Sequence, residues 1–193
     1  MKSTNTKAIA CSLAAATLLV LAATPARALD AYQDRKGLFS GVGLGGGAVL
    51  SDDEAGGEFL FDLTLGGGAT ADLTLALDLD IRYQRFDAER QDWMVVPGPQ
   101  LDWFIAGGLF IRAGIGLALV FTKGPEVGDV PVPAKQVEDN DFTLGFDASL
   151  GLGYEFFANS NLALGLALEG DYYLLDELAD IFGICFSLGL RYY

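Results

Sequence analysis

The chain has 193 residues, enough for one domain with a core, and its 26 acidic against 12 basic residues give a net charge of −14 at pH 7. This balance excludes nucleic-acid binding, which needs a basic surface. Half of the residues (51%) are nevertheless apolar, and the mean hydropathy is +0.34. That pairing is unusual for a soluble acidic protein, and it is typical of chains whose apolar surface is spread over many alternating strands.

The N-terminal segment predicts a secretory signal peptide. A basic start is followed by an apolar run over residues 8–24 and by Ala26-Arg27-Ala28, an A-x-A cleavage pattern at Ala26 and Ala28. A retained transmembrane helix is the alternative, but the run is shorter than the roughly 20 residues that a spanning helix needs. We therefore expect a helical signal peptide that is cleaved after Ala28.

Cleavage would divide the chain into three parts. We expect a signal peptide over residues 1–28, a short periplasmic segment over residues 29–36 and a single domain over residues 37–193. Only Cys185 remains after cleavage, so an intramolecular disulfide framework is excluded.

Eight segments of the remaining chain alternate apolar with small or polar side chains at a period of two residues, which predicts strands. TLALDLDIRYQ is the clearest, because a helical period of 3.6 would scatter its leucines round the axis. The fourth segment contains Pro97 and Pro99, which cannot donate ladder hydrogen bonds, so we expect a bulge or a local irregularity there. The expected strands cover about residues 37–49, 58–67, 73–84, 93–103, 108–121, 142–156, 162–172 and 182–193.

The lengths and the connections of these strands predict their arrangement. Each strand has roughly the 9–11 residues of a tilted membrane-spanning strand, and short mild turns alternate with longer acidic loops. A soluble β-sandwich would explain the alternation but not this asymmetry. We therefore expect an all-β fold, an eight-stranded antiparallel up-and-down transmembrane β-barrel. Its eighth strand should pair with the first, because an open edge would leave backbone groups unsatisfied in lipid.

Aromatic residues near the strand ends predict two girdles at the bilayer interfaces. The expected outer girdle comprises Tyr83, Phe86, Trp93, Phe121, Phe142 and Tyr172. The expected inner girdle comprises Trp103, Phe104, Tyr154, Phe156, Phe157 and Tyr192.

Three features carry a resemblance to a known family: the expected signal peptide, GVGLGGG in the first strand and LGLRYY in the last. On these features, residues 37–193 resemble the small outer-membrane β-barrel proteins of Gram-negative bacteria, the OmpA/OmpX-like group. The resemblance implies the cell outer membrane, contact with its lipid and lipopolysaccharide, and insertion by the barrel-assembly machinery. In that family the machinery reads a signal in the last strand that ends on an aromatic residue. Leu188, Leu190, Tyr192 and Tyr193 match it, although Tyr192 holds the outward register and Tyr193 lies one residue beyond.

The inward face of the expected barrel is rich in ions. We expect interior ion pairs formed by Arg82, Arg112, Arg191, Asp102 and Glu155. An eight-stranded barrel has room for side chains but not for an open channel, so a plug of ion pairs and water is the simple interpretation. The outer half also predicts a cation site, because six carboxylates there face Arg82 alone and hard cations take oxygen ligands. These are Asp62, Asp78, Asp80, Asp147, Glu169 and Asp171.

The residue types argue against an enzyme. The chain has no histidine, which excludes Ser-His-acid catalysis and histidine-ligated metals. GVGLGGG lacks the Lys-Ser/Thr ending of a P-loop, and we expect no cofactor. We expect a monomeric, non-enzymatic barrel with a structural or surface-interaction role in membrane integrity, adhesion or lipopolysaccharide contact. The alternatives are a narrow pore or binding barrel for a small solute or cation, and a soluble lipocalin-like barrel with its apolar face turned inward.

Overall fold

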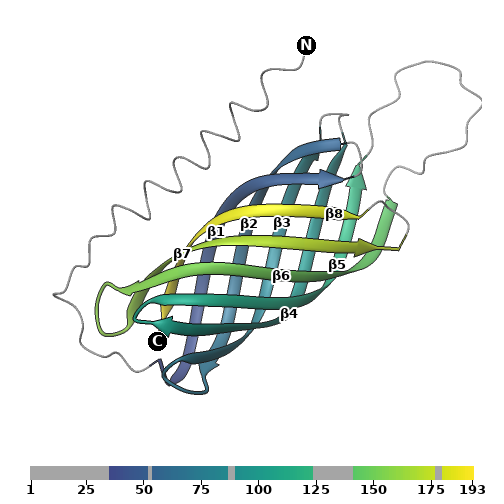
Figure 1. Ribbon diagram of the computed structural model, residues 1–193. Coiled ribbons are helices and arrows are strands. Elements are labelled where there is room, and N and C mark those ends of the chain that lie inside the picture. The colour runs from purple at the N-terminus through teal and green to yellow at the C-terminus, as the bar shows by residue number, and fades with distance from the viewer. Residues whose placement is uncertain (1–34, 52–53, 87–89, 124–140, 177–179) are drawn as a thin grey trace, which may run out of the picture. The chain divides into compact units, whose positions relative to one another are not determined.

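The computed structural model describes residues 35–51, 54–86, 90–123, 141–176 and 180–193. They form eight strands in one closed barrel, in the order of the sequence (Figure 1). The shortest strand has 12 residues and the longest 17. Most strands extend beyond the bounds expected from the sequence, usually by one to four residues at an end. The strands are β1 (Gly37–Ser51), β2 (Glu54–Gly68), β3 (Leu73–Phe86), β4 (Gln91–Ala106), β5 (Leu109–Lys123), β6 (Asp141–Phe157), β7 (Leu162–Leu175) and β8 (Ile181–Tyr192).

Every neighbouring pair of strands is antiparallel, and β8 closes the barrel against β1, as the sequence predicts. The closure is staggered. Cα partners followed once round the barrel from Phe39 return to β1 at Val49 rather than at Phe39. A stagger of this kind requires strands that tilt steeply against the barrel axis.

The period of two residues separates an apolar outer wall from a mainly polar lumen. Outward side chains such as Leu77 and Ile115 are 67% and 65% exposed, whereas inward Asp102 and Asp171 are almost fully buried. The soluble lipocalin-like alternative requires the opposite orientation and is therefore wrong.

Two ends of the barrel are distinguished by their connections. The turn end carries the short β2–β3, β4–β5 and β6–β7 connections and the start of β1, and the loop end carries the other four connections. Gly107 adopts a left-handed φ of 57° in the β4–β5 turn, a conformation that favours glycine.

A cluster of apolar side chains lies in the lumen toward the loop end, beside the buried Asp92 and its partner Arg90, although the sequence pattern predicts small or polar residues on the inner face. Tyr173, Met94 and Phe86 are buried there among aliphatic side chains. Phe86 and, at the turn end, Phe104 therefore point inward, and their assignment to the two girdles was wrong. The full cluster is Val49, Phe86, Met94, Val96, Ala118, Val120, Tyr173, Leu175 and Ile181.

The two prolines of β4 do not shift its register. Pairing with β3 continues through Pro97 and Pro99, while the pairs with β5 stop at Val95 and resume in the same register at Gln100. Both prolines lie at positions of the same parity, so their missing N–H groups face one neighbour, β5. The register shift of this strand pair lies instead between Phe104 and Ala106.

Candidate functional site

A buried arginine organises the loop-end half of the polar lumen. Arg82 is 1% exposed, and its guanidinium donates to Asp80 Oδ2 at 2.7 Å, to Asp171 Oδ2 at 2.8 Å and to Glu58 Oε1 at 3.3 Å. Gln84 Nε2 donates to the other Glu58 oxygen at 2.9 Å. Arg82 is thus shared by three strands, β2, β3 and β7, and Glu58 is a member that sequence reasoning missed.

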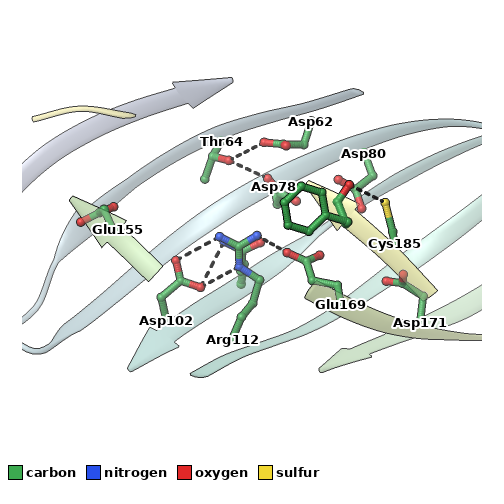
Figure 2. A network of polar contacts seen from close by, with 12 residues as sticks. Asp62, Thr64, Asp78, Asp80, Asp102, Arg112, Glu155, Glu169, Asp171 and Cys185 are labelled. Carbon is green, nitrogen blue, oxygen red and sulfur yellow. Dashed lines mark hydrogen bonds and ion pairs between the residues drawn. The ribbon is translucent and has the colours of Figure 1, made fainter. Parts of the chain in front are cut away.

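A second network fills the turn-end half (Figure 2). Asp102 accepts from Arg112 Nε at 2.8 Å and also from the guanidinium of Arg191. Arg191 continues to Glu155 at 3.4 Å, and Arg112 donates to Glu169. The structure therefore brings together Asp102, Glu155 and two of the arginines expected in interior ion pairs, while Glu169 lies with Arg112 instead of Arg82.

The segment before β1, which the sequence predicts to be periplasmic, adds another interior arginine. Arg35 Nε donates to Glu155 Oε1 at 2.9 Å, and the guanidinium carbon lies 3.7 Å from the centre of the Phe104 ring. A cation over an aromatic face is stabilised by the ring quadrupole. Since Arg35 does not belong to a strand, the strand pattern carried no signal for this contact.

Tyr193 closes the same end of the lumen. Its ring lies 5.3 Å from the rings of both Phe39 and Phe157, and its hydroxyl donates to Glu155 at 3.0 Å. Burial raises the pKa of the Tyr193 phenol above its ordinary value, with Glu155 adding to the effect and Arg191 opposing it. The phenol therefore stays protonated at neutral pH and serves as a donor.

Three of the six carboxylates of the predicted cation site have no arginine partner among the described residues. Thr64 Oγ1 lies 3.2 Å from Asp62 Oδ1 and 2.9 Å from Asp78 Oδ1, and Asp147 Oδ1 is buried without a hydrogen-bond partner. Within the described ranges, no three acidic or cysteine side chains are arranged so that they could hold a metal ion. The six-carboxylate site stays a prediction, and three of its members, Asp80, Asp171 and Glu169, are occupied by arginines.

The outer wall carries a continuous row of aromatic side chains. Phe59, Tyr83, Trp93, Phe121 and Phe142 are Cα partners in turn on β2 to β6. The Tyr83 and Trp93 rings lie 5.0 Å apart and the Phe121 and Phe142 rings 5.2 Å apart. Because the strands tilt, successive Cα partners lie at different heights along the barrel axis. The aromatic row therefore runs obliquely across β2 to β6 and does not form a ring at one height.

The residues of the proposed assembly signal lie at the end of β8. Leu188, Leu190 and Tyr192 all point outward and are 54%, 43% and 59% exposed. Tyr193, the last residue of the signal, turns into the lumen as described above. The apolar outward register of the signal is thus carried by the first three residues.

Several predictions concern parts of the chain outside the described residues. These include the signal peptide, the cleavage residues Ala26 and Ala28, and most of the acidic loops. The described parts contain no helix whose length and apolarity would let it cross a bilayer.

Comparison of the sequence with known protein families finds no match, and comparison with curated protein sequences finds none either. The fold does match solved structures. Neisserial surface protein A superimposes with a TM-score of 0.59 at 12% sequence identity, over 80% of this chain and 96% of that one. Ail, the attachment invasion locus protein of Yersinia pestis, gives 0.53 at 14% identity, over 81% and 98%. The resemblance seen in the sequence is confirmed at the level of fold, which is that of the small eight-stranded outer-membrane β-barrels.

Proposed function

We propose that the protein is a non-enzymatic barrel of the cell outer membrane that presents acidic loops at the surface and acts through contact rather than transport. The observation that carries this proposal is a lumen occupied by its own side chains, inside a wall that is apolar on all sides. A protein with this construction offers partners its outer wall and its loop end.

The outer wall supports a membrane location. Leucine, isoleucine and aromatic side chains face outward from every strand, and large members of this set remain 36% to 83% exposed. Soluble proteins rarely expose apolar patches of more than a few hundred Å². Lipid acyl chains are the partner that matches an apolar surface continuous round a closed barrel.

The contents of the lumen support a role without solute flux. Arg35, Tyr193 and Phe104 fill the turn end, two ion-pair networks fill the middle, and the apolar cluster fills the loop end. Two cavities lined by these side chains measure about 30 and 20 Å³, enough for about two water molecules and about one, respectively. A larger hollow of about 670 Å³ is lined mostly by outward side chains such as Leu65 and Leu77. A narrow pore or solute-binding barrel would need the lumen side chains to move apart together.

The charge of the connections at the loop end indicates the chemistry of a partner. The sequence at this end includes Asp52-Asp53-Glu54, which runs into β2, and Glu138-Asp139-Asn140-Asp141, which runs into β6. Such a surface attracts basic proteins directly, or anionic lipopolysaccharide through divalent cations. The partners named in the resemblance, lipid, lipopolysaccharide and the assembly machinery, belong to this proposal.

The first experiment is fractionation followed by electrophoresis in SDS, with and without boiling. We expect the protein in the outer-membrane fraction and a band whose mobility shifts on boiling, because a closed barrel resists SDS at low temperature. Recovery in the soluble fraction without a shift would refute the membrane location.

A second experiment separates contact from transport. The purified barrel is placed in lipid vesicles, and ion flux is measured beside vesicles that contain an established porin. We expect flux at the level of empty vesicles. Flux that rises in proportion to the inserted protein would favour the narrow pore.

A further inference from the structure

The lumen contains more carboxylates than its arginines can neutralise. Four arginines, Arg35, Arg82, Arg112 and Arg191, lie among the carboxylates of the described polar lumen, and each of them is bonded to at least one carboxylate. Another arginine, Arg90, pairs with the buried Asp92 nearer the loop end. The carboxylates around the four arginines of the polar lumen are Glu58, Asp62, Asp78, Asp80, Asp102, Asp147, Glu155, Glu169 and Asp171. A buried anion without a counter-charge or donor is costly, so the surplus needs another positive partner.

The surplus is concentrated on one patch of the lumen wall. Thr64 and Asp78 are direct cross-strand partners, as are Asp78 and Gly98, and Gly116 and Asp147. Gly98 and Gly116 therefore form a floor without side chains between Asp78 and Asp147. A cavity of about 20 Å³ lies over this floor and is lined by Asp78, Asp80 and Asp147, with room for about one water.

Asp147 provides an independent sign that something is bound there. The residue is 7% exposed, it lines the cavity, and its Oδ1 is buried without any hydrogen-bond partner among the described residues. Buried carboxylate oxygens are almost always paired. Oδ1 must therefore carry a proton itself, or it must accept a hydrogen bond from a small molecule in the cavity.

Hydrogen counting leads to a similar result for the pair Asp62 and Asp78. The Thr64 hydroxyl lies within hydrogen-bond distance of Oδ1 of both Asp62 and Asp78, but a hydroxyl has one proton to donate. The second contact becomes a hydrogen bond only if one carboxyl is protonated and donates to Thr64 Oγ1. Of the two, Asp78 lines the cavity together with Asp147, whereas Asp62 lies against Gly43 on β1, so we assign the proton to Asp78.

We propose that this patch is a proton-binding site, in which Asp78 and Asp147 each take up a proton from solvent as the barrel folds and keep it at neutral pH. A water in the cavity then accepts from Asp147. The site requires no metal ion. The described residues contain no group of three or more side chains arranged to hold one.

The charged groups around the site set the direction of its pH dependence. Asp80 and Arg82 face it from β3, Asp62 from β2, Arg112 from β5, and Glu169 and Asp171 from β7, while β1 presents Gly41 and Gly43 there. Burial is the main factor that disfavours a negative charge on Asp78 and Asp147. The excess of carboxylates over arginines around them adds to this effect. The folded barrel then binds more protons than the unfolded chain, and its stability falls as pH rises through the titration of the site.

The test uses the whole barrel refolded in detergent micelles and does not depend on the surface role proposed above. Infrared spectroscopy detects the C=O stretch of a protonated carboxyl, and urea unfolding at several pH values gives the number of protons taken up on folding. We expect a protonated-carboxyl band at pH 7 that disappears at alkaline pH. Asp78→Asn and Asp147→Asn, which imitate the protonated form, should each weaken the band and lower the proton uptake by about one.

Asp102→Asn is the control, because Asp102 is more deeply buried than either residue of the site but is bonded to Arg112 and Arg191. This variant should lose stability and leave the infrared band unchanged. Absence of the band in the wild-type barrel at pH 7, or unchanged proton uptake in the Asp78→Asn/Asp147→Asn double variant, would overturn the proposal. Alkaline destabilisation that sodium or calcium chloride reverses at constant pH, without a carboxyl band, would also overturn it and assign the site to a metal cation. The wild-type measurements decide the question even if a variant fails to fold.

Discussion

Arg82→Met tests whether the loop-end network is a true buried ion cluster. Methionine keeps most of the side-chain length, so the substitution removes charge and donors more than volume. The guanidinium is bonded to Glu58, Asp80 and Asp171, and the first and third of these side chains are 0% exposed. Removal of one partner from a buried ion pair typically costs about 3–5 kcal/mol, because the other charge stays buried alone.

We therefore expect the free energy of unfolding to fall by about 3–5 kcal/mol at pH 7. Urea unfolding in lipid vesicles measures it, with the fluorescence of Trp93 and Trp103 as the signal. The loss should shrink as pH falls, because protonation neutralises the three orphaned carboxylates. Arg82→Lys keeps the charge but not the planar set of donors, and it should lose less.

Arg85→Met is the control, because Arg85 is exposed on the same strand, and surface substitutions usually change stability by less than about 0.5 kcal/mol. A loss of less than about 1 kcal/mol for Arg82→Met, or equal losses for both variants, would show that the lumen at Arg82 is solvated and would refute the reasoning.

Three further substitutions probe the wall, the glycine contact and the turn end. Ile115→Arg, at a position that is 65% exposed on β5, should cost about 2–4 kcal/mol in a bilayer, with Ile115→Leu as the neutral control; no cost in vesicle refolding would place this face in water. Gly43→Ala should lower the free energy of unfolding by about 1–3 kcal/mol, because the added methyl group displaces Asp62 Oδ2. In a double-mutant cycle, the second substitution Asp62→Ala should recover part of this loss. Additive losses would contradict the contact. Arg35→Met should lower the free energy of unfolding by about 1–3 kcal/mol through the lost bond to Glu155. It should also speed amide hydrogen exchange, first at the turn end. Unchanged exchange there would show that Arg35 does not close this end of the lumen.

Some members of the site could be named from the sequence and others could not. The inward register of Asp102, Arg112 and Arg191 follows from the period of two residues. The partner of each carboxylate does not, because it depends on the stagger that returns Phe39 to Val49. A position along the barrel axis estimated from the strand ends predicts that Glu169 faces Arg82. In the staggered barrel, Glu169 lies beside Arg112 instead.

The sequence by itself determined the number of strands, their antiparallel order, the apolar outer wall and the closure of the last strand on the first. These properties are local or topological: side-chain alternation is set within each strand, and lipid leaves a sheet no open edge. Only the tertiary structure decided which inward side chains meet in the lumen. The apolar cluster at the loop end, Arg35 against Phe104, and the carboxylates without arginines at Asp78 and Asp147 arise from residues far apart in the chain. Strand tilt and register bring them to one height, and a pattern read along single strands contains no information about height.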